Sequence, residues 1–485
     1  MNSLTLEQLI MLLPELLLLV LAVIIMLLPE RARTMAWLVA AGGLAADLLM
    51  CLSLWGVNDY IMGGAYAVNN FAVLVKVMLL GLAMLNVIGS HDFTARVYRA
   101  REYYALLLMA MLGLLIIPSS MDFITLVVAF ELVSITTYVL PLAELNNPQG
   151  GEAALKYFIS GAFASALILY GLSLLYGFTG TMNLQNCAQA MAILGAHPLL
   201  LVALVLLLAG FGYKMALVPF HWWAADTYTG SPSPTTGFLS GVTQKGAFVV
   251  ALKIIVVYSA VFAPLAALLL GVLCAVTMTV GNVLALKQKD VKRMIAYSSV
   301  AHAGNIGVGF AVGGTAIVGS FVHILAHALM AIACFFALQI VFERKGGTMM
   351  QHFRGLGKQM PGLAAALMLL LLSFGGVPPL LGFWGKMLMV VPAVGLGGWY
   401  LVLALILVLN SALSLVYYAA VIREMYMRPA EIELLPPAAD KVKPSGRSYQ
   451  LALWLSVALL LAFGLLPNWL TEICSIALFN SMLPW

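Results

Sequence analysis

Charged side chains are scarce in this sequence: 9% of its 485 residues are Asp, Glu, Lys or Arg, against 63% that are hydrophobic. A soluble domain carries roughly 25% charged residues because its exterior faces water. A chain of this length would ordinarily form about three soluble domains. The composition instead excludes a large water-exposed surface, and it predicts one bundle of hydrophobic helices in lipid.

Cysteine is also rare, and no two cysteines have the Cys-x-x-Cys spacing of a redox or zinc site. A role as small buried hydrophobes is favoured over a disulfide or metal role for Cys51, Cys187, Cys274, Cys334 and Cys474. No phosphate-binding loop stands out, and the pair His323 and His327 lacks the glutamate of a zinc-protease helix. We therefore expect no metal or cofactor site on this chain.

The N-terminus lacks the basic segment of a signal peptide, since Glu7 and Glu15 stand where Lys or Arg would be expected. The first apolar run is therefore interpreted as a permanent span. Each apolar run is able to cross about 30 Å of hydrocarbon as a helix. The predicted fold is all-α, with about fourteen transmembrane helices at 9–28, 35–55, 71–90, 103–117, 121–143, 153–177, 199–225, 237–259, 262–285, 294–312, 314–342, 361–393, 398–422 and 450–472.

Lys and Arg are missing from loops such as 56–70 and 178–198. Eighteen of the 24 basic residues fall on the other side of the predicted bundle: Arg31, Arg33, Arg96, Arg99, Arg101, Lys287, Lys289, Lys292, Arg293, Arg344, Lys345, Arg354, Lys358, Arg423, Arg428, Lys441, Lys443 and Arg447. Because basic loops stay in the cytoplasm, that side is predicted to be cytoplasmic and both termini to face outward. The net charge of +5 is thus a topology signal and does not indicate nucleic-acid binding.

The remaining basic residues lie within or at the edges of predicted spans: Lys76, Lys156, Lys214, Lys245, Lys253 and Lys386. The same is true of the acids Glu15, Asp47 and Glu131. Charges in hydrocarbon are costly and usually mark an ion path. Glu15, Asp47 and Lys76 have two interpretations, as structural or snorkelling groups and as members of a functional pair. Lys253 lies toward the end of its span, which favours a side chain that snorkels to the membrane surface.

Two long runs are interrupted by proline. Pro219 follows Lys214 in the seventh run, and Pro378 and Pro379 precede Lys386 in the twelfth. A proline removes a backbone hydrogen bond and breaks or kinks a helix, so both runs are candidate discontinuous helices beside a lone lysine. They cross the membrane in opposite directions, and inverted repeats with broken helices at matching positions are typical of transporters. Two ordinary proline kinks are the alternative.

A carboxylate, Glu131, stands near the middle of the fifth span. Desolvation favours the neutral form of an isolated carboxyl or amine, whereas pairing with a lysine restores both charges at a smaller cost. Separating such a pair releases a proton from the lysine, and bringing the partners together draws a proton back. Lys214, Lys245 and Lys386 are therefore predicted to form a row of proton stations across the bundle.

Three histidines lie in or beside predicted spans ten and eleven: His302, His323 and His327. His323 and His327 share one helix face. Neutral histidines relay protons near physiological pH, which supports a role for all three in proton transfer. Hydrogen-bonded core histidines are the alternative interpretation.

Residues 214–234, 288–302 and 378–386 resemble the antiporter-like membrane subunits of respiratory complex I, the NADH-quinone oxidoreductase. The resemblance covers roughly residues 100–425. The stretch 156–180 and the segment Tyr228-Thr-Gly-Ser-Pro are most similar to the subunit N branch, and so is a lysine at position 386, where subunit M carries a glutamate. Two features depart from that branch: no proline follows Trp223, and the two histidines of span eleven are more typical of the other antiporter-like subunits.

The resemblance implies roles in proton transfer for Glu131, Lys214, Lys245, Lys386 and the span-six lysine, Lys156. It also implies two inverted five-helix repeats. The expected segments are an N-terminal three-helix part at 1–102, a first repeat at 103–260, a second repeat at 261–427, and a cytoplasmic linker with the last helix at 428–485.

The function implied by the resemblance is proton translocation in a bacterial inner membrane, driven by redox chemistry elsewhere in a complex. NADH, FMN, iron–sulfur clusters and quinone would belong to other subunits. The expected partners are subunit M, the small membrane subunits, protons and lipid. A subunit of a stand-alone cation/proton antiporter would share the same features. A structural scaffold is a third possibility, and it would tolerate neutral replacements of Glu131 and Lys214.

Overall fold

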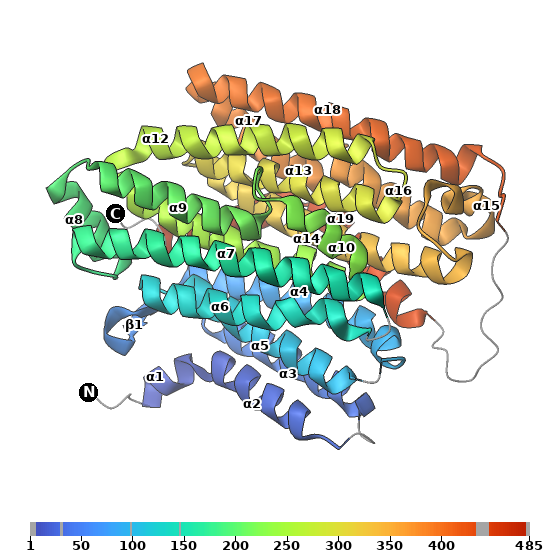
Figure 1. Cartoon of the computed structure of the whole chain (residues 1–485), viewed down its shortest axis with the longest axis horizontal. Helices are drawn as coiled ribbons and strands as arrows, with labels where there is room; N and C mark the ends of the chain where they lie inside the picture. The colour runs from blue at the N-terminus through green and yellow to red at the C-terminus, as the bar shows by residue number, and fades with distance from the viewer. Residues whose placement is uncertain (1–5, 30–32, 98, 145–146, 433–445, 482–485) are drawn as a thin grey trace.

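The computed structural model describes residues 6–29, 33–97, 99–144, 147–432 and 446–481. The described chain is almost entirely helical, and most helices run side by side along one direction (Figure 1). Apolar side chains cover much of the exterior, as expected for helices that face lipid. The predicted all-α membrane fold is confirmed.

The N-terminal half contains a short β-hairpin among its helices. Its elements are α1 (Leu6–Met11), α2 (Leu13–Leu27), α3 (Arg33–Ser53), β1 (Asp59–Ile61), η2 (Met62–Gly64), β2 (Tyr66–Val68), α4 (Asn70–Thr94), α5 (Ala100–Ser119), α6 (Phe123–Val139), η3 (Leu140–Ala143), α7 (Pro148–Thr179), α8 (Leu184–Leu194), α9 (Pro198–Met215) and α10 (Trp222–Gly230). The strands β1 and β2 pair antiparallel.

The C-terminal half is helical throughout its described part. It contains α11 (Ser233–Phe238), the π-helical turn η4 (Leu239–Thr243), α12 (Gln244–Leu286), α13 (Val291–Val312), α14 (Ala316–Lys345), η5 (Met350–Phe353), α15 (Leu356–Gln359), α16 (Pro361–Gly375), α17 (Leu381–Leu396), α18 (Gly398–Met427), α19 (Arg447–Leu465) and α20 (Pro467–Ser481). Helix α12 is interrupted at Phe262, at the junction of predicted spans 237–259 and 262–285.

Among the described helices, ten are long and apolar enough to cross a membrane, and α2, α16 and α17 are shorter apolar helices. The run 361–393 is divided into α16 and α17, and the run 199–225 into α9 and part of α10. Both predicted discontinuous helices are therefore present. The total of fourteen spans stays a prediction.

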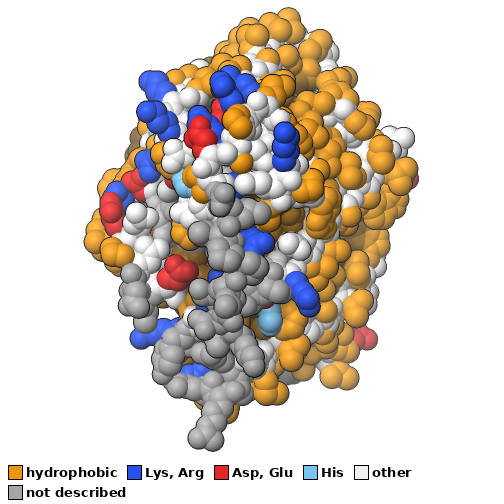
Figure 2. Space-filling view, turned by 90° about the vertical axis from the view of Figure 1, so that its right-hand side faces the viewer, with side chains coloured by type: hydrophobic (Ala, Val, Ile, Leu, Met, Phe, Trp, Pro, Cys, Tyr) orange, Lys and Arg blue, Asp and Glu red, His pale blue; other side chains and the backbone are white. Residues whose placement is uncertain are grey.

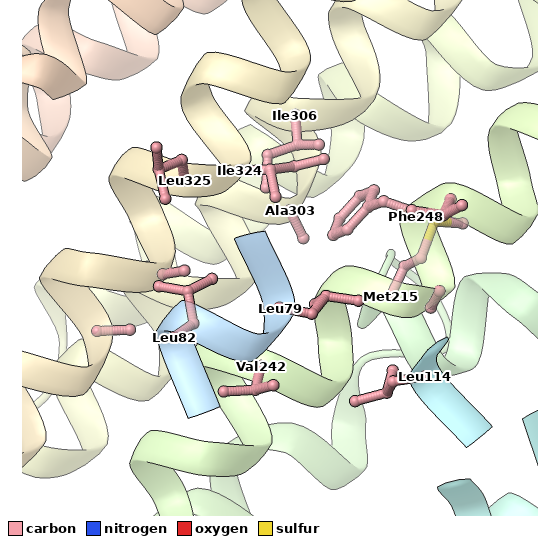
Figure 3. Packing of buried hydrophobic residues seen from close by; sticks show 14 of the residues in the cluster. Leu79, Leu82, Leu114, Met215, Val242, Phe248, Ala303, Ile306, Ile324 and Leu325 are labelled. Carbon is pink, nitrogen blue, oxygen red and sulfur yellow. The ribbon is translucent and has the colours of Figure 1, made fainter. Parts of the chain in front are cut away.

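The interior is organised around α14, which is buried along almost its whole length. Helices α11, α13, α16, α17 and α19 pack against it. Figure 3 shows part of the apolar core between α4, α5, α9, α12, α13 and α14, with Leu79, Leu82, Leu114, Met215, Val242, Phe248, Ala303, Ile306, Ile324 and Leu325. Lipid supplies no hydrophobic driving force between helices, so close packing must hold this interior together.

Small residues allow α12 and α13 to pack closely. A Cβ atom at Gly304 would lie 2.8 Å from the backbone nitrogen of Met278, and one at Gly281 would lie 2.6 Å from the backbone nitrogen of Ala301. Either position would force the helices apart if it carried a side chain. Glycine at both positions is thus required for this packing.

Basic side chains gather at one end of the bundle, which faces the viewer in Figure 2. Ion pairs join the helix ends there: Arg96 Nη1 lies 2.9 Å from Glu343 Oε1, and Arg354 Nε lies 2.8 Å from Glu424 Oε2. The hairpin β1–β2 lies at the opposite end of the molecule (Figure 1). Arg31, Lys441, Lys443 and most of the predicted linker lie outside the described residues.

Several elements differ from the sequence prediction. The last span was predicted at 450–472, but α19 ends at Leu465 and a separate helix, α20, begins at Pro467. Proline at this position lacks the backbone N–H that would continue the preceding helix, so a new helix starts. The hairpin and α8 were not predicted either, because both fall in loops without strong apolar periodicity.

Candidate functional site

The first helix break follows Met215 at the end of α9. Ala216 adopts the left-handed conformation with φ 62°, and the Leu217 backbone N–H donates to the Gly212 carbonyl at 2.8 Å. The Val218–Pro219 peptide bond is cis, and α10 starts at Trp222. The proline thus marks a true interruption of the helix, as the sequence predicted.

Neighbouring side chains satisfy the backbone groups that this break leaves without helical partners. The Trp223 indole donates to the Tyr213 carbonyl at 2.8 Å, and the Gln244 amide donates to the Met215 carbonyl at 2.8 Å. The Val218 N–H donates to the Thr277 hydroxyl at 3.0 Å. Broken backbone at membrane depth is tolerated only when its polar groups find such partners.

Lys214 is buried one residue before the end of α9. Its Nζ lies 4.8 Å from the centre of the Tyr138 ring and 4.6 Å from the centre of the Tyr157 ring. It has no hydrogen-bond partner among the described residues. The ammonium group is therefore stabilised by two aromatic faces. Trp223 stacks on Tyr157, with 4.6 Å between the two ring centres. We call Tyr138, Tyr157 and Trp223 the aromatic cage.

Glu131 lies on α6, in the neighbouring helix layer, and is half-buried. One carboxylate oxygen accepts a hydrogen bond of 2.6 Å from the Ser165 hydroxyl of α7. No ion pair within 4.0 Å links Glu131 to Lys214, but the two charges interact electrostatically. The structure thus shows the predicted partners separated, each with a different neighbour.

Lys245 is buried at the start of α12, directly after the π-helical turn η4. Its Nζ lies 2.7 Å from His327 Nδ1 and donates to the Gln244 side-chain oxygen at 3.0 Å. Gln244 therefore contacts both the first helix break, through Met215, and the second lysine of the row. A π-helical turn widens the helix locally and is frequent at functional sites.

The three predicted histidines form one buried group between α13 and α14. His302 Nδ1 and His323 Nε2 are 3.0 Å apart, and the ring centres of His302 and His327 are 5.2 Å apart. The Tyr418 hydroxyl lies 3.4 Å from His302 Nε2 and 2.5 Å from the Ser298 hydroxyl. The structure therefore brings Lys245 and all three histidines together as two hydrogen-bonded pairs, Lys245–His327 and His302–His323, whose rings lie next to each other.

Lys386 lies beyond the second break, in α17. Gly376 is left-handed with φ 84°, the Val377 N–H donates to the Leu372 carbonyl at 3.1 Å, and the Pro378–Pro379 bond is cis. Lys386 Nζ donates to the Phe374 and Gly375 carbonyls at 2.9 and 3.3 Å. These carbonyls end α16, where the helix dipole favours a positive charge.

Lys156 lies apart from this row. Its side chain is 40% exposed and forms ion pairs of 2.7 Å with Glu152 and with Asp226, which also pairs with Arg293 at 2.9 Å. Asp226 therefore joins α7, α10 and α13 through exposed charges.

Lys253 does not snorkel, and this expectation was wrong. The residue is 6% exposed, and its Nζ donates to the Pro118 carbonyl at 2.8 Å and also to the Ser120 carbonyl. The end of α5 supplies these acceptors inside the bundle, so the side chain has no need to reach the membrane surface.

The arrangement as a whole is a line of buried or half-buried ionisable groups. It runs from Glu131 and Lys214 through Gln244 to Lys245, the histidines and Lys386. Such a line is suited to moving protons within a membrane.

Comparison with known proteins identifies the family of this fold. The family described as NADH:quinone oxidoreductase/Mrp antiporter, TM, matches residues 120–414, which contain both broken helices and every lysine of the line. The chain belongs to this family.

Its relatives include curated proteins that cover nearly the full chain. The F(420)H(2) dehydrogenase subunit N of Methanosarcina mazei is 36% identical over 96% of this chain and 98% of its own length. The NADH-quinone oxidoreductase subunit N of Moorella thermoacetica is 32% identical over 92% of both chains. The resemblance to the subunit N branch is thus confirmed, and this member of the family is an antiporter-like membrane subunit.

Solved structures share the fold. A chain of respiratory complex I from Thermus thermophilus aligns with a TM-score of 0.79 at 32% identity, covering 95% of this chain and 98% of its own. A chain of the Mrp complex from Dietzia aligns with a TM-score of 0.84, covering 97% of each chain. At 22% identity, the second likeness shows the fold alone.

Sequence reasoning missed the residues that connect the predicted groups. Gln244 stood next to Lys245, but its contact with Met215 depends on how α9 and α12 pack. Ser165, Tyr138 and Tyr157 lie in otherwise apolar helices, and their polar atoms gave a weak signal. A search along one helix face would not have selected the tyrosines, because Tyr138, Tyr157 and Lys214 lie on three different helices, α6, α7 and α9.

Proposed function

We propose that this chain is a proton-translocating subunit of a redox-driven membrane complex of the NADH-quinone oxidoreductase type. Electron transfer and quinone reduction occur in partner subunits, and this chain carries protons. The observation that carries the proposal is Lys214: a buried lysine without a hydrogen-bond partner, in an aromatic cage, within electrostatic reach of Glu131. A purely structural lysine would be expected to have its N–H groups satisfied.

The geometry supports a switch between two charge states. When Glu131 is held by Ser165, as here, Lys214 lacks an ion-pair partner, and desolvation favours loss of its proton. When Glu131 moves toward Lys214, the carboxylate stabilises the ammonium form and the lysine takes up a proton. Movement of one carboxylate thus changes the proton affinity of the lysine.

A proton released from Lys214 has a route along the buried line. Gln244 bridges the break and Lys245, and Lys245 contacts His327. The pair His302 and His323 continues the line toward Lys386. Each transfer moves one proton between nitrogen atoms, and a neutral imidazole accepts on one nitrogen and donates from the other. The roles of Glu131, Lys214, Lys245, Lys386, His302, His323 and His327 are part of this proposal.

The complex and its orientation are proposals as well. The subunit N names of the relatives support partner membrane subunits, among them a subunit M type neighbour and small membrane subunits. The relative in Methanosarcina belongs to an F(420)H(2) dehydrogenase, so the electron donor is set by other subunits. The basic end would face the cytoplasm and the hairpin the outside of a bacterial inner membrane.

The matching breaks support an inverted-repeat organisation. Ala216 and Gly376 are both left-handed, and the hydrogen bonds that close the two helix ends have the same pattern. Segments 103–260 and 261–427 are therefore proposed as the two repeats. Lys156, with Asp226 and Arg293, would lie near proton entry at the basic end, because these charges are partly exposed.

The fold likeness to the Mrp complex favours one alternative, a cation/proton antiporter subunit. The two functions differ in the driving force. Copurification with flavin- and iron–sulfur-containing subunits would support the redox complex, and pumping driven by a cation gradient alone would support the antiporter.

The test is proton pumping in inverted membrane vesicles carrying Lys214→Ala, measured together with electron transfer from donor to quinone. We expect pumping to fall by roughly 100-fold or more, with coupled electron transfer falling too, while the complex stays assembled. Unchanged pumping in Lys214→Ala would show that the buried lysine is structural and would overturn the proposal.

A further inference from the structure

Four buried polar residues meet outside the proposed repeats, in the N-terminal helices. They are Glu15 of α2, Asp47 of α3, Tyr66 of the hairpin strand β2 and Lys76 of α4, which we call the N-terminal cluster. None is more than 6% exposed. The line from Glu131 to Lys386 does not include them.

Three members are joined by short hydrogen bonds. Lys76 Nζ lies 2.6 Å from Glu15 Oε1, the Tyr66 hydroxyl donates to the same oxygen at 2.5 Å, and Lys76 Nζ donates to the Tyr66 oxygen at 2.7 Å. The hydroxyl therefore bridges the ion pair. A proton shift is balanced within this triangle: a Lys76 N–H bond breaks as the Tyr66 oxygen takes the proton, and the original Tyr66 proton forms an O–H bond on Glu15.

The acids of the cluster outnumber its amine. Asp47 is fully buried on α3, which packs against both α2 and α4, the helices of Glu15 and Lys76. Both Asp47 carboxylate oxygens and Glu15 Oε2 are buried without a hydrogen-bond partner among the described residues. One ammonium cannot compensate two buried carboxylates, and an uncompensated buried charge is costly. A bound proton on one of the acids restores neutrality, so the cluster is built to hold an exchangeable proton.

Lys253 shares α12 with Lys245 and contacts a residue that pairs with the cluster. It lies two turns along α12 from Lys245, about 12 Å. It donates to the Ser120 carbonyl, and Ser120 forms an isolated β-bridge with Tyr66. The second buried amine of α12 thus stands between Lys245 and the cluster.

The cluster lies at the end of the bundle opposite the basic loops. Glu15 is in the first turn of α2, and the hairpin that contributes Tyr66 lies at the left end in Figure 1, away from α15. The segment 56–70, which includes this hairpin, contains no Lys or Arg. A proton held here is therefore close to the side that faces outward in the proposed orientation.

We propose that the N-terminal cluster is an additional proton-holding site, which receives protons from Lys245 by way of Lys253 and releases them on the side opposite the basic loops. The inference rests on the proposed function, because it adds a branch to the same proton route. Lys76 supplies the counter-charge and is reprotonated after each transfer through Tyr66, and Asp47 or Glu15 holds the transferred proton.

Two kinds of variant test the cluster in the intact complex. Asp47→Asn removes the unpartnered acid with little change in shape, and Asp47→Glu restores an acid. The double variant Glu15→Gln with Lys76→Met removes both charges of the ion pair at once. A purely structural ion pair tolerates replacement by a neutral pair of similar volume, whereas a proton-holding site does not.

The measurement is the number of protons pumped per electron in inverted vesicles, with Lys214→Ala assayed in parallel. We expect Asp47→Asn and the double variant to lower this ratio by about twofold or more, and Asp47→Glu to recover it. Normal ratios in both neutral variants would overturn the inference. If Lys214→Ala is impaired in that case, the proposed function stands, and if Lys214→Ala is also normal, both fail.

A second measurement needs no variant and remains valid if the variants do not assemble. Dicyclohexylcarbodiimide reacts with protonated carboxyl groups in apolar surroundings, and mass spectrometry of the labelled wild-type complex locates the adduct. We expect labelling at Asp47 or Glu15 that decreases as the outer pH is raised. Absence of label at both acids would contradict a proton-holding cluster.

Discussion

The two broken helices have similar backbone conformations, but their lysines lie on opposite sides of the break. Each break has a left-handed residue, Ala216 or Gly376, and the peptide bond that begins two residues later is cis. In the first break the lysine precedes the left-handed residue, whereas in the second it follows the break, in α17. Lys214 has aromatic rings around it, and Lys386 has carbonyl oxygens.

This difference shows that a broken helix does not by itself determine how a lysine is held. In the first break, Trp223 and Gln244 already occupy the free carbonyls, so Lys214 is left without acceptors. In the second, Lys386 itself occupies the carbonyls of Phe374 and Gly375. The contacts of Lys386 stabilise the second break, whereas Lys214 makes no such contact, in keeping with the proposed change of its charge.

The largest expected effect comes from replacing each of these lysines by methionine. Lys214→Met and Lys386→Met should both reduce proton pumping by roughly 100-fold. Lys386→Met should in addition destabilise the fold by about 1–3 kcal/mol, because it leaves two buried carbonyls unpaired. Lys214→Met should leave the stability of the fold unchanged, because an apolar side chain fits the aromatic cage. Pumping assays and thermal unfolding of the purified complex measure the two effects. Equal destabilisation by Lys214→Met and Lys386→Met would refute the proposed difference between the two lysines.

A smaller effect is expected at Gly161, which allows Tyr138 to approach α7. A Cβ atom at Gly161 would overlap the Tyr138 ring and hydroxyl. Gly161→Ala should displace this wall of the aromatic cage and lower pumping by roughly tenfold. Gly151→Ala on the same helix is the matched control, because a Cβ atom there meets nothing within 4 Å. Similar pumping in the two alanine variants would show that the cage geometry is unimportant.

The smallest effect is expected for Trp223→Phe, which keeps an aromatic ring against Tyr157 but removes the indole N–H that serves the Tyr213 carbonyl. We expect a loss of about 1 kcal/mol in stability and a decrease in pumping of about twofold. Trp222→Phe is the control, because Trp222 is 56% exposed and makes neither contact. If Trp222→Phe is as damaging as Trp223→Phe, the hydrogen bond to the Tyr213 carbonyl does not stabilise the first break.

The sequence was informative where the chemistry is local. Proline and glycine positions located both breaks, and charges in apolar runs located the buried lysines, because both signals are costly in lipid. It was less informative where partners come from distant helices. The contact of Gln244 with Met215, the carbonyl acceptors of Lys253 and the exposed ion pairs of Lys156 all depend on helix packing. Single-sequence patterns do not contain that information.

The predicted helix boundaries were wrong for a similar reason. The last predicted span ran through Leu466 into α20, since apolar composition continues past the point where the backbone turns at Pro467. The hairpin β1–β2 was missed because three-residue strands leave no periodic pattern. Only the structure shows that this hairpin brings Tyr66 into contact with Glu15 and Lys76.

The burial of α14 has a consequence for the membrane itself. This helix carries His323 and His327 and is shielded by other helices along almost its whole length. Small ions in the surrounding solution therefore meet tightly packed side chains before they reach the histidines. A membrane that stores energy as a voltage must not leak, and an enclosed histidine helix provides electrical insulation around the groups proposed to carry protons.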